Sequence, residues 1–260
     1  MCLLIFAHRV ADGYPLVLAA NRDEFYNRPT APAQFWPDHP ELLAGRDLEQ
    51  GGTWMGVTRG GRFAAITNYR DPARTAPAPR SRGELPLGFL TGNNTPAAYM
   101  AQLRTDAGHY AGFNLLLGDA GELWYFTNSG RGADQEPTCL EPGIYGLSND
   151  QLDTPWPKVD AGKRKLQAVL DSASPPDHDA LGQVVGDRQQ ASPRALARQG
   201  LEGEMDQLLS AQFIVTGLYG TRSTTSLWLD ARGGVDWREV SFNDRGELNG
   251  TQQVAFRLSD

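Results

Sequence analysis

The chain has 260 residues, 40% of them hydrophobic and 21% charged, a composition typical of a globular protein with a substantial core. Its formal net charge of -7 and the absence of any run of Lys or Arg argue against nucleic acid as a partner. Two cysteines are too few for a disulfide framework, and the apolar stretch at residues 2–7 is too short for a secretion signal or a membrane span. We therefore expect a cytoplasmic protein that is not embedded in a membrane.

Pairs of strands joined by short turns recur along the chain. The first pair, CLLIFAHRV and YPLVLAANR, flanks Ala11-Asp12-Gly13, and Asp-Gly is a strong hairpin signal. Because hairpins pair strands antiparallel, the sheets are expected to be antiparallel. The later strand-like runs are TWMGVT and RFAAITNY, FNLLLG and ELWYFTN, then FIVTGLY, TTSLWLD and VDWREVSF.

Five helical stretches separate these strands, at residues 84–91, 96–107, 159–172, 193–199 and 203–209. Antiparallel strands with segregated helices indicate an α+β fold rather than a parallel array. Residues 71–81, rich in Pro and Ala, are expected to form a surface loop. No repeat or linker divides the chain, so residues 1–260 are predicted to form a single domain.

Cys2 is the first candidate functional residue, and two interpretations of it stay open. As a small hydrophobic residue, it is suited to begin a buried strand. Alternatively, removal of the initiator Met leaves Cys2 with a thiol and a free α-amine, whose pKa of ~7.7–8.0 suits it to accept the thiol proton. His8 lies six residues along the same strand, too far for contact with Cys2.

An ordered series of motifs extends from Met1 to about residue 230, and it resembles the NRDE family, also called the transport and Golgi organisation 2 family. The family is similar in plan to the N-terminal nucleophile (Ntn) hydrolases. The resemblance implies a four-layer αββα sandwich, in which two antiparallel sheets pack between helices. The motifs are MCLLIF, LAANRDEFYNRP, GGTWMGV, AAITNYRD, SRGEL, GFNLLLGD, YGLSN followed by TPWPKV, and YGTRSTTSLWL.

The resemblance also implies catalytic roles, carried over from cysteine enzymes that cleave bile-salt amides or penicillin V. Cys2 is the expected nucleophile, and Asp23 is expected to hold its amine. Asn68 and Asn149 resemble oxyanion-hole residues, which stabilise the charge that develops during amide attack. Arg222 matches an arginine that lies near the active site late in the chain.

One position departs from the pattern of those enzymes. They carry an Arg three residues before the Asp, where this chain has Ala20. Arg22 adjoins Asp23 instead, and alternation along a strand predicts that the two side chains project to opposite sides. The residues predicted to bind substrate are Asn21, Arg22, Glu24, Arg28 and Tyr69.

The sequence supports an enzyme most strongly: a thiol-dependent hydrolase or acyltransferase for a small amide or thioester, with no metal or cofactor required. The alternative is a carrier, because animal members of the family are linked to haem trafficking and to acyl-coenzyme A or lipid metabolism. Haem would take Cys2, His8 or His109 as an axial ligand. Acyl-coenzyme A would place its phosphates near Arg22 and Arg28. A purely structural or trafficking role ranks last, since no coiled coil or repeat is present.

Overall fold

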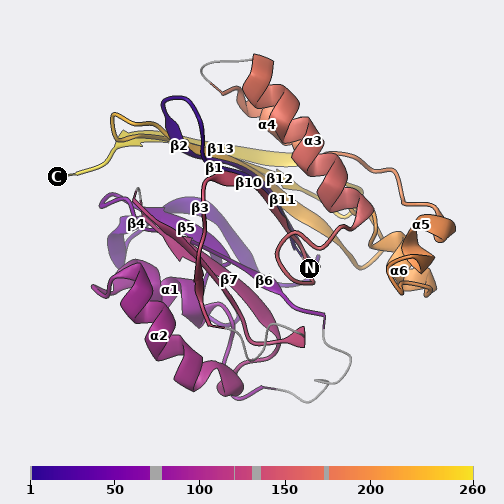
Figure 1. Cartoon of the computed structure of the whole chain (residues 1–260), viewed down its shortest axis with the longest axis horizontal. Helices are drawn as coiled ribbons and strands as arrows, with labels where there is room; N and C mark the ends of the chain where they lie inside the picture. The colour runs from indigo at the N-terminus through magenta and orange to yellow at the C-terminus, as the bar shows by residue number, and fades with distance from the viewer. Residues whose placement is uncertain (1, 71–77, 120, 131–135, 173–175, 260) are drawn as a thin grey trace.

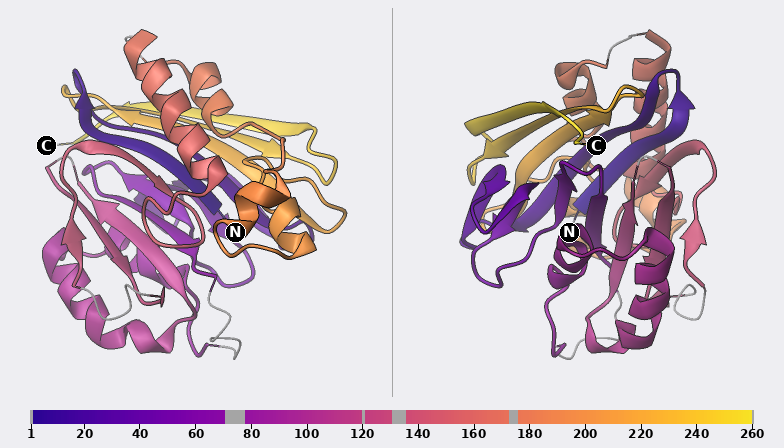
Figure 2. Two further views of the ribbon diagram at one scale, coloured as in Figure 1. Left: turned by 45° about the vertical axis from the view of Figure 1, so that its right-hand side comes forward. Right: turned by 90° about the vertical axis from the view of Figure 1, so that its left-hand side faces the viewer.

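Two antiparallel sheets lie face to face between two groups of helices in the computed structural model (Figures 1 and 2). The structure describes residues 2–70, 78–119, 121–130, 136–172 and 176–259. The helices α3 and α4 cover the outer face of one sheet, and α1 and α2 cover the outer face of the other (Figure 1). The predicted αββα sandwich is therefore confirmed.

The first sheet combines the first two strands of the chain with strands at residues 143–147 and 219–257, so segments that are distant in sequence lie side by side. Its central strands β1, β2 and β11 run antiparallel, and Cys2 pairs with Arg22 across the first hairpin. Its six strands, in sheet order, are β10 (Gly143–Leu147), β1 (Cys2–Ala11), β2 (Tyr14–Phe25), β11 (Tyr219–Leu229), β12 (Gly234–Phe242) and β13 (Leu248–Arg257).

The second sheet follows the chain order from edge to edge. It is built largely from hairpins, including the predicted pairs on either side of Gly60-Gly61 and of residues 119–121. Its seven strands are β3 (Thr30–Trp36), β4 (His39–Asp47), β5 (Met55–Thr58), β6 (Phe63–Asn68), β7 (Phe113–Gly118), β8 (Leu123–Thr127) and β9 (Thr138–Cys139).

The helices agree closely with the predicted stretches. Thr95 caps α2 through its side chain, and Pro96 occupies the first turn, where its missing N–H has no cost. None of the helices within the described residues combines the length and hydrophobicity that a membrane span requires. The helices are α1 (Glu84–Thr91), α2 (Pro96–Asp106), the short 3-10 helix η1 (Ala107–His109), α3 (Pro157–Ser172), α4 (His178–Val184), α5 (Pro193–Ala197) and α6 (Glu204–Leu208).

The apolar start of the chain is explained by burial on both faces of β1. Leu4 and Phe6 face the second sheet, whereas Leu3 and Ile5 face α3, and all four are almost fully buried. A strand buried on both faces does not alternate between apolar and polar residues, which is why MCLLIF is continuously apolar.

Some predicted elements were wrong or missing. FIVTGLY is not a strand: β11 begins at Tyr219, and only an isolated bridge joins Val215 to Gly220. The run instead turns back on itself: the Thr221 N–H donates to the Ile214 carbonyl oxygen at 2.8 Å, and the Thr221 hydroxyl accepts the Ile214 N–H at 2.9 Å. The strands β3, β4, β9, β10 and β13 and the helix α4 were not predicted, and most of the predicted loop at residues 71–81 lies outside the described residues.

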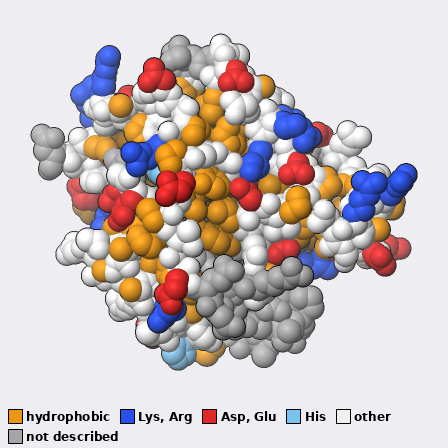
Figure 3. All heavy atoms as spheres, in the orientation of Figure 1, with side chains coloured by type: hydrophobic (Ala, Val, Ile, Leu, Met, Phe, Trp, Pro, Cys, Tyr) orange, Lys and Arg blue, Asp and Glu red, His pale blue; other side chains and the backbone are white. Residues whose placement is uncertain are grey.

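Charges on one face of the molecule are mixed rather than segregated. On the face drawn in Figure 3, Lys and Arg side chains alternate with Asp and Glu around a central group of hydrophobic side chains.

Candidate active site

A cavity of about 380 Å³ opens where the two sheets end beside Cys2. Its walls come from the ends of β1, β2 and β6, from residues between 47 and 54, and from residues 78–83 before α1. We call it the Cys2 cavity. Segments far apart in sequence therefore surround one sulfur atom, in a space large enough for a small-molecule ligand.

Cys2 is placed by the hairpin at the first position of β1, directly opposite Arg22. It is 9% exposed, and it lines the cavity. Burial raises the pKa of the Cys2 thiol, and the Asp23 carboxylate raises it further. The Asp23 backbone N–H and the Arg22 guanidinium lower the thiol pKa, so the thiolate has donors beside it once it forms.

Arg22 and Asp23 leave β2 on opposite faces, as alternation predicts. The Arg22 guanidinium carbon lies 4.2 Å from the centre of the Trp54 ring, on the side of the second sheet. Asp23 points the other way, and its Oδ1 accepts a hydrogen bond from Thr221 Oγ1 at 2.7 Å. Burial raises the pKa of the Asp23 carboxyl, and the Thr221 hydroxyl opposes that shift. Both residues line the cavity because β2 ends there.

The Arg22 guanidinium is the most unusual polar group of the cavity. The side chain is 6% exposed, and its Nη1 has no hydrogen-bond partner among the residues that the structure describes. A buried donor without a partner costs about 1–3 kcal/mol, and more when the group is charged.

The two predicted oxyanion residues have different positions. Asn68 lines the Cys2 cavity at the end of β6. Asn149 does not line it: this side chain is 1% exposed, and its Nδ2 donates to the Asn68 carbonyl oxygen at 2.8 Å. The adjacent Ser148 Oγ donates to the Cys2 carbonyl oxygen at 3.0 Å. Asn149 and Ser148 therefore connect Asn68 and Cys2, which both line the cavity.

Some of the predicted substrate-binding residues line the cavity, and others do not. Glu24 and Arg28 line the cavity, and Arg28 pairs with Asp47 at 2.7 Å and with Glu49 at 3.2 Å. Asn21 is buried and donates its Nδ2 to the carbonyl oxygens of residues 185 and 212, both at 2.8 Å.

Two further predicted residues also lie outside the cavity walls. Tyr69 donates its hydroxyl to Asp150 Oδ1 at 2.8 Å. Arg222, the predicted late arginine, donates its Nη1 to the carbonyl oxygens of Phe25 at 2.9 Å and Arg28 at 3.0 Å. Arg222 therefore supports the chain just beyond β2.

Among the residues of this region that sequence reasoning missed, three lie in motifs quoted above. Trp54, from GGTWMGV, stacks on Arg22. Arg82, from SRGEL, lines the cavity and donates Nη1 to the Gly112 carbonyl oxygen at 3.1 Å. Lys158, from TPWPKV, is 5% exposed, and both Asp23 and Cys2 influence its pKa. Their position within these motifs was the signal that could have identified them.

Among the described residues, no group of three or more His, Cys, Asp or Glu side chains is arranged to hold a metal ion.

Comparison with known proteins now adds a family to this geometry. The family model described as Transport and Golgi organisation 2 matches residues 1–244, and that range contains the whole cavity. The chain belongs to this family. It is 37% identical to the Transport and Golgi organization 2 homolog of Mus musculus and 36% identical to the homolog of Homo sapiens. Each alignment covers 94% of this chain and 94% of the relative.

Solved structures place this Transport and Golgi organisation 2 family member among Ntn-hydrolase-like folds. A variant of the conjugated bile acid hydrolase from Clostridium perfringens matches with a TM-score of 0.52. The alignment covers 98% of both chains at 9% sequence identity, so this similarity concerns the fold alone.

Proposed function

We propose that the protein is a thiol-dependent hydrolase or acyltransferase for a small amide or thioester that carries an anionic group. The observation behind this proposal is the juxtaposition, in one cavity, of Cys2 and the buried Arg22 guanidinium with its unpartnered Nη1. Arg82 adds a second cation that forms no ion pair with a described residue. No cofactor is required for this chemistry.

In the proposed reaction the Cys2 thiolate attacks the carbonyl carbon and forms a tetrahedral oxyanion. The C–N or C–S bond then breaks, and the leaving amine or thiolate takes a proton. The acyl group is left as a thioester on Cys2. Attack by water completes hydrolysis, and attack by a second amine or alcohol completes acyl transfer. Both routes regenerate the Cys2 thiol.

The proton from Cys2 needs an acceptor because burial raises the pKa of the thiol. In our proposal the acceptor is the α-amine of Cys2, freed by removal of Met1, which lies outside the described residues. Asp23 is proposed to hold this amine. It comes directly after Arg22, which pairs with Cys2, so it lies beside the start of β1. Asn68 is the proposed oxyanion donor at the cavity wall, and Asn149 orients it.

A thiol-labelling experiment tests the nucleophile. We expect an iodoacetamide probe to label Cys2 faster than Cys139 at pH 7.5, although Cys139 is exposed and Cys2 is buried. Mass analysis of the two peptides measures both rates in one sample. Equal rates, or no label at Cys2, would contradict the nucleophile. An intact mass that includes Met1 would contradict the amine as base.

A substrate panel tests the anionic group. We expect N-acyl amino acids with a free carboxylate to react faster than the matched carboxamides. Substitution Arg22→Gln should remove that preference, lowering kcat/KM for the charged series about tenfold or more, because hydrogen bonds to charged groups contribute about 1.5–3 kcal/mol. Arg59→Gln is the matched control, since Arg59 also stacks on an aromatic ring, 3.9 Å from the centre of Phe35, but does not line the cavity. Equal loss for both substrate series would contradict this role.

Haem is the alternative ligand, and the geometry limits how it would bind. Cys2 and His8 lie on one strand, about 20 Å apart at the usual rise of 3.3 Å per residue, so they cannot ligate the same iron. His109 is exposed in η1. A Soret band with stoichiometric hemin that disappears in Cys2→Ala would favour the carrier. We also propose a cytoplasmic location, in keeping with the two free thiols.

A further inference from the structure

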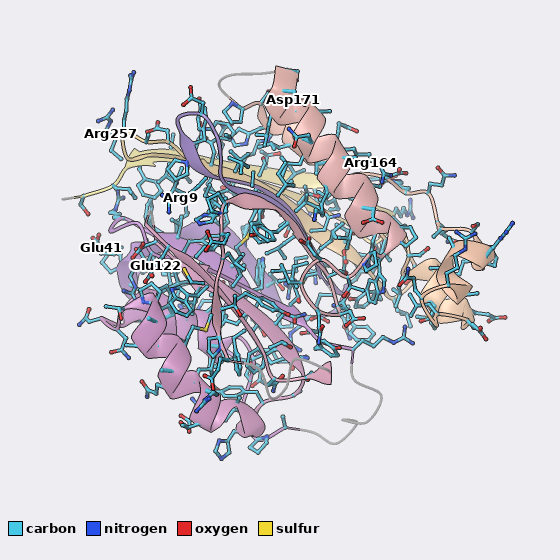
Figure 4. All side chains as sticks on the ribbon, viewed as in Figure 1. Arg9, Glu41, Glu122, Arg164, Asp171 and Arg257 are labelled. Carbon is cyan, nitrogen blue, oxygen red and sulfur yellow. The ribbon has the colours of Figure 1, made fainter. Side chains whose placement is uncertain are left out.

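A second, much smaller cavity also touches Cys2, and we call it the inner cavity. Its volume is about 10 Å³, enough for one group the size of a water molecule or a methyl. Its walls include Leu4, Ala20 and Met55, which belong to the hydrophobic core between the two sheets. Charged side chains on the outside of the molecule, such as Arg164 and Asp171 on α3, are exposed instead (Figure 4).

The inner cavity adjoins the Cys2 cavity. The residues that line both spaces are Cys2, Arg22, Trp54 and Ile66. The Arg22 guanidinium carbon lies 4.2 Å from the centre of the Trp54 ring, so this stacked pair forms a wall common to the two spaces. Cys2 therefore lies where a large cavity and a small one meet.

The two cavities differ in polarity as well as in size. Arg22 is the only charged residue among the described residues that line the inner cavity, whose other walls include four apolar side chains. A small apolar space stays dry and admits apolar groups. The Cys2 cavity has many more charged residues in its walls, including Glu24, Arg28, Asp47, Glu49 and Arg82. A molecule bound at Cys2 thus meets a charged space on one side and an apolar space on the other.

We propose that the inner cavity is an acyl pocket, which restricts the substrate to a short acyl group such as acetyl. The inference rests on the proposed function, in which Cys2 attacks a carbonyl carbon. That carbon carries the leaving group on one side and the acyl substituent on the other. The leaving group, with its anionic part, fits the large charged cavity, and a methyl group fits the inner cavity. Longer acyl chains do not fit, because extra methylenes forced into a packed core displace its side chains.

The test compares S-acetyl-, S-butyryl- and S-hexanoylthioglycolate, thioesters whose leaving group carries a carboxylate. The Cys2 thiolate attacks the carbonyl carbon, the C–S bond breaks, and thioglycolate leaves and takes a proton, while the acyl group stays on Cys2. Chromatography measures the release of thioglycolate, and the rate in Cys2→Ala is subtracted to remove the contribution of Cys139. We expect the acetyl thioester to react at least about tenfold faster than the butyryl thioester, because overpacking a core is costly.

Two variants change the size of the inner cavity. Met55→Ala enlarges it, so the ratio of the butyryl rate to the acetyl rate should rise about tenfold. Met100→Ala is the matched control, because Met100 is also buried, in α2, but lines neither cavity, and the ratio should stay unchanged. Circular dichroism establishes that each variant is folded. If Met55→Ala does not fold, Ala20→Val decides: two added methyl groups fill the cavity, so the acetyl rate should fall about tenfold, and an unchanged rate would overturn the proposal.

This experiment also separates the inference from the function on which it rests. Equal rates for the acetyl and hexanoyl thioesters, or the same change of ratio in Met55→Ala and Met100→Ala, would overturn the acyl pocket and leave the proposed nucleophile intact. If none of the three thioesters releases thioglycolate faster than in Cys2→Ala, the proposed function is contradicted, and this inference with it.

Discussion

The first sheet carries two buried polar clusters, and they differ in one decisive respect. At the cavity, Cys2, Arg22 and Asp23 adjoin open space, and Arg22 Nη1 has no described partner. Farther along the sheet, His178 Nδ1 lies 2.7 Å from Ser226 Oγ and its Nε2 lies 2.9 Å from Asp236 Oδ1. Ser, His and Asp are the residue types of a hydrolytic triad, yet His178 and Ser226 are only 6% and 3% exposed.

The comparison teaches that residue types alone do not identify a site. In the His178 cluster each polar group satisfies another, and the imidazole also stacks on Trp228 with the ring centres 4.2 Å apart. Such a network stabilises the attachment of α4 to the sheet. In the Cys2 cluster Arg22 Nη1 has no described partner, and Arg22 lines a cavity. Our proposal of a ligand site rests on this difference.

The largest expected difference between the clusters concerns activity. Cys2→Ala should lower kcat at least about 10³-fold, because Cys2 is the only thiol among the described residues that line the cavity. Ser226→Ala should leave kcat within about twofold. Steady-state assays on the best substrate of the panel measure both variants. Loss of activity in the serine variant alone would reverse our assignment of the two clusters.

A smaller effect is expected from the carboxylates. Asp23→Asn should lower kcat about 10²-fold, since proton transfer by a positioned group contributes about 10²–10⁴-fold. The matched change Asp236→Asn, in the other cluster, should not alter kcat, although it should lower the melting temperature. Similar kcat values for the two variants would show that Asp23 has no catalytic part.

The free energy of unfolding should respond in the opposite order, with a larger loss for a variant in the His178 cluster than for one in the Cys2 cluster. His178→Leu leaves Ser226 and Asp236 without their partner, so we expect the free energy of unfolding to fall by about 1–3 kcal/mol. Cys2→Ala should cost less than about 1.5 kcal/mol, because only one partly enclosed sulfur is removed. Urea denaturation measures both. A larger loss for the cysteine variant would mean that its sulfur is chiefly a packing element.

The smallest effect is a pH dependence of stability. Burial lowers the pKa of His178 despite the opposing Asp236 carboxylate, so the folded state keeps the imidazole neutral where the unfolded chain binds a proton. Stability should therefore fall as the pH drops below about 6.5, the ordinary pKa of histidine. His8, also buried with a lowered pKa, contributes with the same sign. In His178→Gln part of this fall should disappear, and an identical pH profile would contradict the assignment.

Turn and capping residues in the sequence predicted strands and helices well where neighbouring residues determine the structure. The Asp12-Gly13 turn, with Gly13 at φ 75°, forms the first hairpin, and Thr95 with Pro96 starts α2. Prediction failed at residues 213–218, where the apolar run suggested a strand but the chain turns back on itself, with backbone and side-chain hydrogen bonds between Ile214 and Thr221. The strand β3 was missed because Pro32 within it reads as a break, although it lies on an edge strand where Pro is tolerated.

The amino-acid sequence by itself determined the hairpins, most helices, the family resemblance and the candidates Cys2 and Asp23, because turn residues, periodicity and ordered motifs act over short spans. Only the tertiary structure decided which candidates share a cavity: Arg22 and Asn68 line it, whereas Asn21, Tyr69, Asn149 and Arg222 are engaged elsewhere. The physical reason is that burial and an unpartnered donor depend on how separate strands and helices pack.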